Sequence, residues 1–154
     1  MRDYDFRGKT MKEHGLLPAG SWIYGGIYID YCYGARPDGI YQIVNWNSGG
    51  PGGFTQQLEI DRKTAGQYTG RMTWDKKRIY EGDVLYFTIF DYDGGDTQHK
   101  GVVKWVDELA SFILAESMDS NEGYWLYLVL DNDDSAEKIG NIHDNPELLE
   151  VQDQ

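Results

Sequence analysis

The 154-residue sequence has one cysteine, four prolines and no long apolar run. Cys32 can form no disulfide within the chain, so nothing indicates an oxidising compartment. The longest apolar stretch, from Tyr124 to Leu130, is far shorter than the roughly 20 residues of a membrane span. The opening MRDYDFRGK is charged from its second residue and lacks the apolar centre of a secretory signal. We therefore expect a soluble protein in the reducing cytoplasm of a cell.

Basic residues are scarce in the second half of the chain. Residues 1–78 carry 11 Lys and Arg against 8 Asp and Glu, a net charge of +3, whereas residues 79–154 carry 3 against 18, a net charge of −15. Six of the basic residues fall within residues 62–78. The acidic half repels phosphate groups, which disfavours non-specific duplex binding by the whole chain.

Residues that favour strands are abundant: 12 Tyr, 5 Trp and 5 Phe, with 19 glycines between the apolar runs. Turn-forming segments such as DYDGGD at 91–96 and DNDDSAE at 131–137 separate these runs. We expect eight strands, at residues 22–33, 40–46, 56–60, 84–90, 101–106, 111–116, 124–130 and 138–142.

These strands predict one mainly β domain over residues 1–154, a meander that closes into an SH3-like or related small barrel or sandwich. Within it we expect an N-terminal β region at 1–66, a β region carrying the motifs at 67–150, and a tail at 151–154. One short C-terminal helical turn is expected at NPELLE, residues 145–150, because Pro follows a capping residue there. Its leucines, Leu148 and Leu149, should be at least partly buried.

The titratable residues form no recognisable catalytic or metal-binding motif. DYDGGD at 91–96 lacks the Gly and Glu that a helix-loop-helix calcium loop needs at its sixth and twelfth positions, which favours a hairpin turn. The three histidines, at 14, 99 and 143, are too far apart for a zinc motif. Cys32 is expected to be a small core residue rather than a nucleophile. We therefore expect a protein that is not an enzyme and uses no cofactor and no metal.

Residues 67–149 contain four short motifs, each once and in this order: QYTG at 67–70, IYEGDV at 79–84, GVVKW at 101–105 and IGNIHDNPELL at 139–149. Together with FRGK at 6–9 and WIYG at 22–25, they resemble the YopX-like family of phage and prophage proteins. The connector at 71–78, RMTWDKKR, departs from the family pattern because the two-residue Asn-Gly turn is missing. The resemblance implies a mainly β fold and a phage or prophage origin, and it assigns no catalytic residue.

Three classes of function follow from these observations. The first is a non-enzymatic binding or regulatory module that acts on a host or phage protein. The second is a nucleic-acid-associated protein, either a weak binder through residues 62–78 or an acidic mimic of DNA. The third is a small hydrolase that uses paired carboxylates. Homo-oligomers are compatible with the opposite charges of the two halves.

The candidate interaction surface surrounds the departing connector. Its residues combine basic and aromatic side chains next to two family motifs: Tyr68, Arg71, Trp74, Lys76, Lys77, Arg78, Tyr80 and Glu81. Trp74 lies where a hairpin tip is expected. It either folds back over the barrel and is buried, as large aromatic residues usually are, or forms an aromatic anchor within a basic rim.

Overall fold

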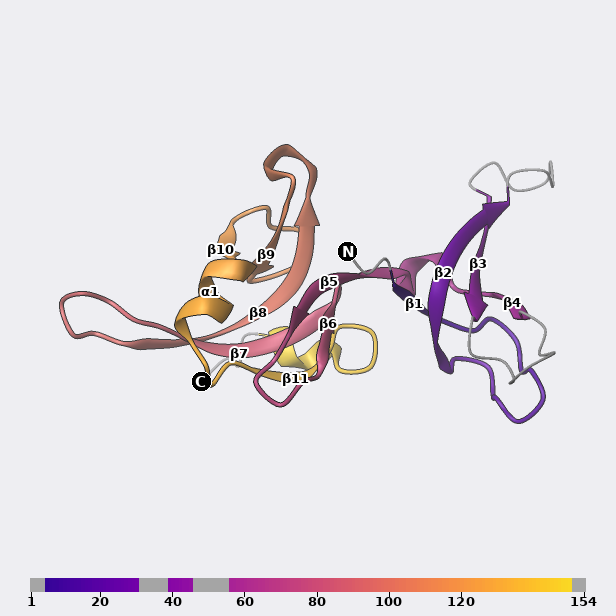
Figure 1. Cartoon of the computed structure of the whole chain (residues 1–154), viewed down its shortest axis with the longest axis horizontal. Helices are drawn as coiled ribbons and strands as arrows, with labels where there is room; N and C mark the ends of the chain where they lie inside the picture. The colour runs from indigo at the N-terminus through magenta and orange to yellow at the C-terminus, as the bar shows by residue number, and fades with distance from the viewer. Residues whose placement is uncertain (1–4, 31–38, 46–55, 151–154) are drawn as a thin grey trace. The chain divides into compact units, whose positions relative to one another are not determined.

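The computed structural model describes residues 5–30, 39–45 and 56–150, and the chain divides into two compact units, Met1–Tyr68 and Thr69–Gln154 (Figure 1). The boundary falls two residues after the division at 66 and 67 that the sequence predicts between two regions of one domain. That the whole chain is one domain stays a prediction. Cys32 and the turn segments at 34–38 and 47–53 lie outside the described residues.

The first unit is an antiparallel sheet with the strand order β4-β3-β2-β1-β5. Its elements in chain order are β1 (Phe6–Lys9), β2 (Trp22–Asp30), β3 (Ile40–Asn45), β4 (Gln56–Glu59), the 3₁₀ helix η1 (Arg62–Thr64) and β5 (Gly66–Met72). Four buried residues form its core: Ile23, Ile43, Leu58 and Ile60. The strand β5 continues past the boundary into the second unit.

The second unit is built on an antiparallel sheet with the order β10-β9-β8-β7-β11. Its strands are β6 (Arg78–Tyr80), β7 (Asp83–Ile89), β8 (Thr97–Val106), β9 (Ser111–Ala115), β10 (Gly123–Trp125) and β11 (Glu137–Asn141). Its helices are the 3₁₀ helix η2 (Asp107–Leu109), the α-helix α1 (Leu126–Asn132) and the 3₁₀ helix η3 (Pro146–Leu149). β6 pairs with the later part of β5.

Both faces of this second sheet are apolar, because successive side chains on a strand point to opposite faces. In β8, Val103 belongs to one buried cluster and the neighbouring Val102 to the other. The first cluster packs against Leu126 and Val129 of α1. The second packs against Leu149 of η3. The helical elements therefore cover opposite faces of the same sheet.

The motif at 79–84 forms a tight turn that leads into β7. Gly82 has a φ of 89°, a backbone conformation that glycine adopts readily. The Tyr80 amide donates a hydrogen bond of 2.8 Å to Oδ2 of Asp83, the residue that begins β7. GVVKW at 101–105 lies in β8, which returns from the DYDGGD hairpin to pair with β7.

The prediction of a mainly β fold with a C-terminal helical turn is confirmed. η3 is that turn, and Leu148 and Leu149 are both partly buried. The sheets are not closed into a full barrel. None of the helices in the described part of the chain is long and apolar enough to cross a membrane.

The predicted strand at 124–130 is wrong. Only Gly123–Trp125 is a strand, and Leu126–Asn132 is the helix α1. Leu126 and Val129 are buried and Leu130 is partly buried, which is the i, i+3, i+4 spacing of a helix with one face on the core. Three strands were not expected from the sequence: β1, β5 and β6.

Candidate interaction site

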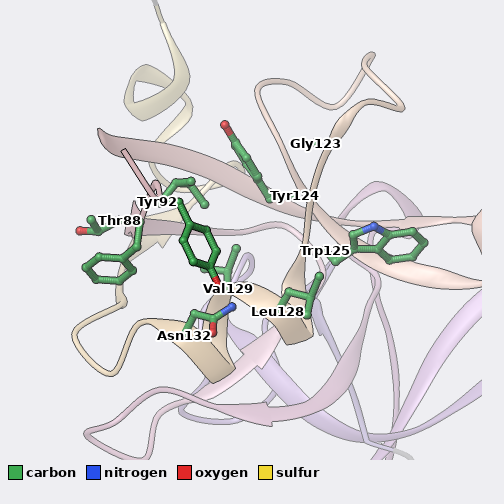
Figure 2. Close-up of a pocket in the computed structure, with 10 residues that line it drawn as sticks. Thr88, Tyr92, Gly123, Tyr124, Trp125, Leu128, Val129 and Asn132 are labelled. Carbon is green, nitrogen blue, oxygen red and sulfur yellow. The ribbon is translucent and has the colours of Figure 1, made fainter. Parts of the chain in front are cut away.

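An apolar cavity of about 510 Å³ opens on the second unit. Figure 2 shows its side chains, which come from the end of β7, the hairpin after it, β10 and α1. We call it the aromatic pocket, and its ten lining residues are Thr88, Ile89, Phe90, Tyr92, Gly123, Tyr124, Trp125, Leu128, Val129 and Asn132. Both its size and its mainly apolar lining with a few polar groups are typical of ligand and anchor sites.

The hairpin between β7 and β8 supplies one wall. The last pair of this ladder joins Ile89 to Thr97, so residues 90–96 form the connecting loop. The loop contains a turn in which the Gly94 amide donates to the Asp91 carbonyl at 3.1 Å. Phe90 and Tyr92 lie in this loop and reach the aromatic pocket. A hairpin tip needs no aromatic residues for its own folding, so these two rings are available for another role.

The strand β10 and the helix α1 supply the other wall. Gly123 pairs with Ala115 at the edge of the sheet, and a Cβ atom at position 123 would lie only 2.2 Å from the carbonyl oxygen of Leu114. This close approach requires glycine and brings Tyr124 and Trp125 onto the pocket. The helix then contributes two consecutive residues to the pocket, Leu128 and Val129. Val129 is buried and Leu128 is exposed.

A buried carboxylate joins the two walls. Asp133 follows α1, and its Oδ2 accepts a 2.7 Å hydrogen bond from the amide of Thr88 in β7. Its Oδ1 accepts hydrogen bonds from the amide and hydroxyl of Ser135, at 2.9 and 2.6 Å. Burial by itself raises the pKa of Asp133, but the hydrogen bonds from Ser135 and Thr88 outweigh it and hold the pKa below its usual range. The ionised Asp133 therefore fixes the position of α1 against β7.

Several pocket side chains are exposed although they are large and apolar. Phe90 is 53% exposed, Tyr92 is fully exposed, and Leu128 on α1 is exposed as well. Apolar side chains that gather around one cavity mark an interaction site, whereas single exposed ones do not. Aromatic residues are also enriched at the centres of protein interfaces. The aromatic pocket thus has the composition of a protein-binding site.

None of the ten lining residues is charged, but the two segments that supply them are acidic. Residues 88–99 and 119–137, which contain all the lining residues, include no Lys and no Arg. They include nine acidic residues: Asp91, Asp93, Asp96, Asp119, Glu122, Asp131, Asp133, Asp134 and Glu137. Arg71 of β5 forms an ion pair with Asp131, and Asp133 is buried, so these two carboxylates are already engaged.

A second exposed feature of this unit is the turn between β5 and β6, residues 73–77, which we call the hairpin tip. Trp74 is 67% exposed there, so of the two alternatives for this residue, the one in which it folds back and is buried is wrong. The Thr73 amide donates to the Lys77 carbonyl at 3.0 Å, and the Lys76 amide donates to the Thr73 carbonyl at 2.9 Å. Lys76 has a φ of 61°, which few residues other than glycine adopt and which the surrounding bonds must maintain.

Side chains also stabilise the hairpin tip. The hydroxyl of Thr73 donates to Asp75 and accepts from the Lys77 amide at 3.2 Å. Lys77 Nζ lies 3.3 Å from Asp75 Oδ2. The hydrogen bond from Thr73, with a smaller contribution from Lys77, holds the pKa of Asp75 below its usual range. The turn is therefore ordered by its own residues, and Trp74 is held outside it.

The structure separates the eight residues of the predicted interaction surface. Tyr68 and Tyr80 are buried and belong to the interior, which corrects their assignment to a surface. Arg71 and Glu81 are partly buried. The exposed members are Trp74, Lys76, Lys77 and Arg78, all at or next to the hairpin tip. Arg62 and Lys63 of the same basic segment lie in η1 of the first unit.

A second, polar cavity of about 340 Å³ shares Gly123 and Tyr124 with the aromatic pocket. Its lining includes Glu116 and Glu122 together with His99, whose ring stacks on Phe87 at 5.7 Å. Both glutamates are exposed, whereas a hydrolase needs one of its two carboxylates in apolar surroundings. Within residues 5–30, 39–45 and 56–150, no group of three or more His, Cys, Asp or Glu side chains could hold a metal ion.

The aromatic pocket was not predicted from the sequence, because its two walls lie more than 25 residues apart in the chain. A family model described as YopX protein matches residues 42–150. The chain belongs to the YopX family. The YopX match contains the whole aromatic pocket and the hairpin tip, while FRGK at 6–9 and WIYG at 22–25 precede it. No curated protein matches the chain.

Proposed function

We propose that this YopX family member is a non-enzymatic protein-binding module, encoded by a phage or prophage, that acts on a host or phage protein in the bacterial cytoplasm. Its binding site is the aromatic pocket. The phage origin comes from the family resemblance, and the site comes from the geometry of the second unit.

The aromatic pocket is the observation that carries this proposal. A bulky apolar side chain from a partner would displace water from Phe90, Trp125 and Leu128, and burial of apolar area stabilises by roughly 25 cal/mol per Å². The polar groups on the lining are a few hydroxyl and amide groups that can orient a bound chain. The acidic segments that carry the lining residues add an electrostatic preference for a partner segment with Lys or Arg.

Affinity capture from host cells that carry the phage tests the proposal with two matched Leu→Asp variants. Leu128→Asp places a charge on the aromatic pocket, whereas Leu109→Asp places the same charge on an equally exposed leucine of η2 that does not line it. A genuine partner should be captured by the native chain and by Leu109→Asp, and its recovery should fall at least about tenfold with Leu128→Asp. A partner that Leu128→Asp retains in full would contradict the proposal.

Nucleic acid is the competing class of ligand, since an exposed Trp among basic residues can stack on an unpaired base. The net charge of −12 and the ion pair between Lys77 and Asp75 both weaken attraction to phosphate. In the same capture experiment, material that nuclease releases and that Trp74→Ala fails to capture would favour the nucleic-acid function. Material that resists nuclease and depends on Leu128 would favour the protein-binding function.

A further inference from the structure

The second unit exposes both a pocket and a side chain that matches the pocket. We infer that the aromatic pocket of one copy receives the hairpin tip of a second copy, with Trp74 as the anchor. This inference rests on the proposed function of the pocket as a protein-binding site, and it identifies one partner as the chain itself.

The shape of the hairpin tip suits an inserted anchor. Trp74 projects from a tight turn and is 67% exposed. The hydrogen bonds of Thr73 and the ion pair of Asp75 with Lys77 already order the turn. A rigid anchor loses little conformational entropy on binding, and Trp is among the residues most enriched at binding hot spots. The lining of the pocket, with Phe90, Tyr124 and Trp125, offers aromatic faces and edges to an indole ring.

The charges of the two surfaces are complementary. Asp75 follows Trp74 and pairs with Lys77. The three basic residues Lys76, Lys77 and Arg78 come next and are exposed, so residues 75–78 carry three positive charges against one negative, a net charge of +2. The loop beside Phe90 and Tyr92 carries three exposed carboxylates, at 91, 93 and 96, and no basic residue. Insertion of Trp74 would bring the basic residues next to these acids. Opposite charges at the rim speed association and specify orientation, and salt weakens them.

The donor must be another molecule. In the chain itself Trp74 is exposed and does not line the pocket, so its own copy leaves the pocket open. The ion pair between Arg71 and Asp131 joins β5 to the last turn of α1 in the same copy. The tip and the pocket are different surfaces of one copy. Two copies can therefore exchange tips in a reciprocal pair that contains two identical contacts, or each copy can bind the next one to form a closed ring or an open chain.

Sedimentation velocity of the full chain at 0.05 M and 1 M salt tests the inference with complementary variants. Trp74→Ala keeps the pocket but loses the anchor, and Leu128→Asp keeps the anchor but loses the pocket. The native chain should form species larger than 17.7 kDa as its concentration rises at low salt, and 1 M salt should weaken this association because it screens the charges at the rim. Each variant alone should associate at least about 30-fold more weakly, the effect of losing a hot-spot residue.

A mixture of the two variants is the decisive sample. One intact anchor and one intact pocket should restore association, and it should stop at two copies because only one kind of contact is left. The inference would be overturned if the native chain stays monomeric at 0.05 M salt and high concentration, or if the mixture stays monomeric. The proposed function is tested separately: if Leu128→Asp no longer captures a foreign partner, that function still holds even when the chain does not self-associate. Leu109→Asp, at an exposed leucine outside the pocket, should associate like the native chain and serves as the control for added charge.

Discussion

Nζ of Lys138 lies 3.1 Å from Oδ2 of Asp83, a carboxylate whose side chain is fully buried. Asp83 begins β7, and Lys138 lies in β11, the strand that pairs with β7 at the edge of the sheet. The same carboxylate oxygen accepts the amide of Tyr80 within the family motif at 79–84. This charge pair thus links the buried carboxylate of the second motif to the residue that directly precedes the fourth.

Removal of the cation from this pair should destabilise the second unit. We expect Lys138→Met to lower the free energy of unfolding by about 3 kcal/mol, because the carboxylate of Asp83 stays buried without it. Urea denaturation of Lys138→Met, Asp83→Asn and the double variant checks this. The double variant should lose less than the sum of the single losses. Losses that simply add would show that the two side chains do not interact.

The fold was predictable where strands are apolar and bounded by turns. The ladder of β7 and β8 follows from two runs rich in Val, Ile and Phe around DYDGGD. β1 and β5 have the sequences FRGK and GQYTGRM, which carry few apolar residues and become strands through pairing with their neighbours. The run from Leu126 to Leu130 is too short for its periodicity to distinguish a helix from a strand.

The candidate site was only half predictable. Trp74 and its basic neighbours could be singled out because they replace a turn sequence that hairpins favour. The aromatic pocket depends on the tertiary contact between α1 and the β7–β8 hairpin, which no local pattern encodes. The one signal in the sequence was Phe90 and Tyr92, alternating with aspartates in a turn that needs no aromatic residues.

Acid should loosen the walls of the aromatic pocket through Asp133. Its pKa in the folded protein is lower than its unfolded value of about 3.9, so its stabilising effect is complete above that value and is lost as the pH falls through the folded pKa. We expect Asp133→Asn to be less stable than the native chain at pH 7 and to show a smaller further loss below pH 4. Melting temperatures between pH 2 and pH 7 measure this difference, and parallel profiles would contradict it.

The order of the hairpin tip should strengthen self-association. Thr73→Val keeps the shape of the side chain but removes the hydroxyl that bonds Asp75 and Lys77. A typical hydrogen bond contributes about 1 kcal/mol, so the melting temperature should fall by roughly 2–4 °C. The association constant should fall by up to roughly fivefold, because the tip must then be ordered on binding. Thr69→Val, in β5 and outside the tip, also removes a hydroxyl that accepts a backbone hydrogen bond, from Arg71. It is the matched control and should associate like the native chain. Equal association of both variants would show that tip order is unimportant.

The C-terminal turn should contribute modestly to stability. Leu149 of η3 is partly buried and packs against the cluster that contains Val102 and Ile113. We expect Leu149→Ala to lower the free energy of unfolding by about 1–2 kcal/mol, below the range for a fully buried leucine. Glu150→Ala, at the exposed next residue, should have no measurable effect in the same denaturation experiment. A loss below about 0.5 kcal/mol for Leu149→Ala would show that η3 is not docked.

The most direct test of the central claim is a methyl NMR titration that uses the two complementary variants. The Trp74→Ala chain, with labelled Leu and Val methyl groups, receives unlabelled Leu128→Asp chain, which supplies the only intact anchor. The methyl signals of Leu128 and Val129 in the pocket should shift as the anchor binds, while those of Val102 on the other face of the sheet should stay in place. Unchanged pocket signals, or shifts that spare Leu128 and Val129, would contradict the claim that the aromatic pocket receives Trp74 of another copy.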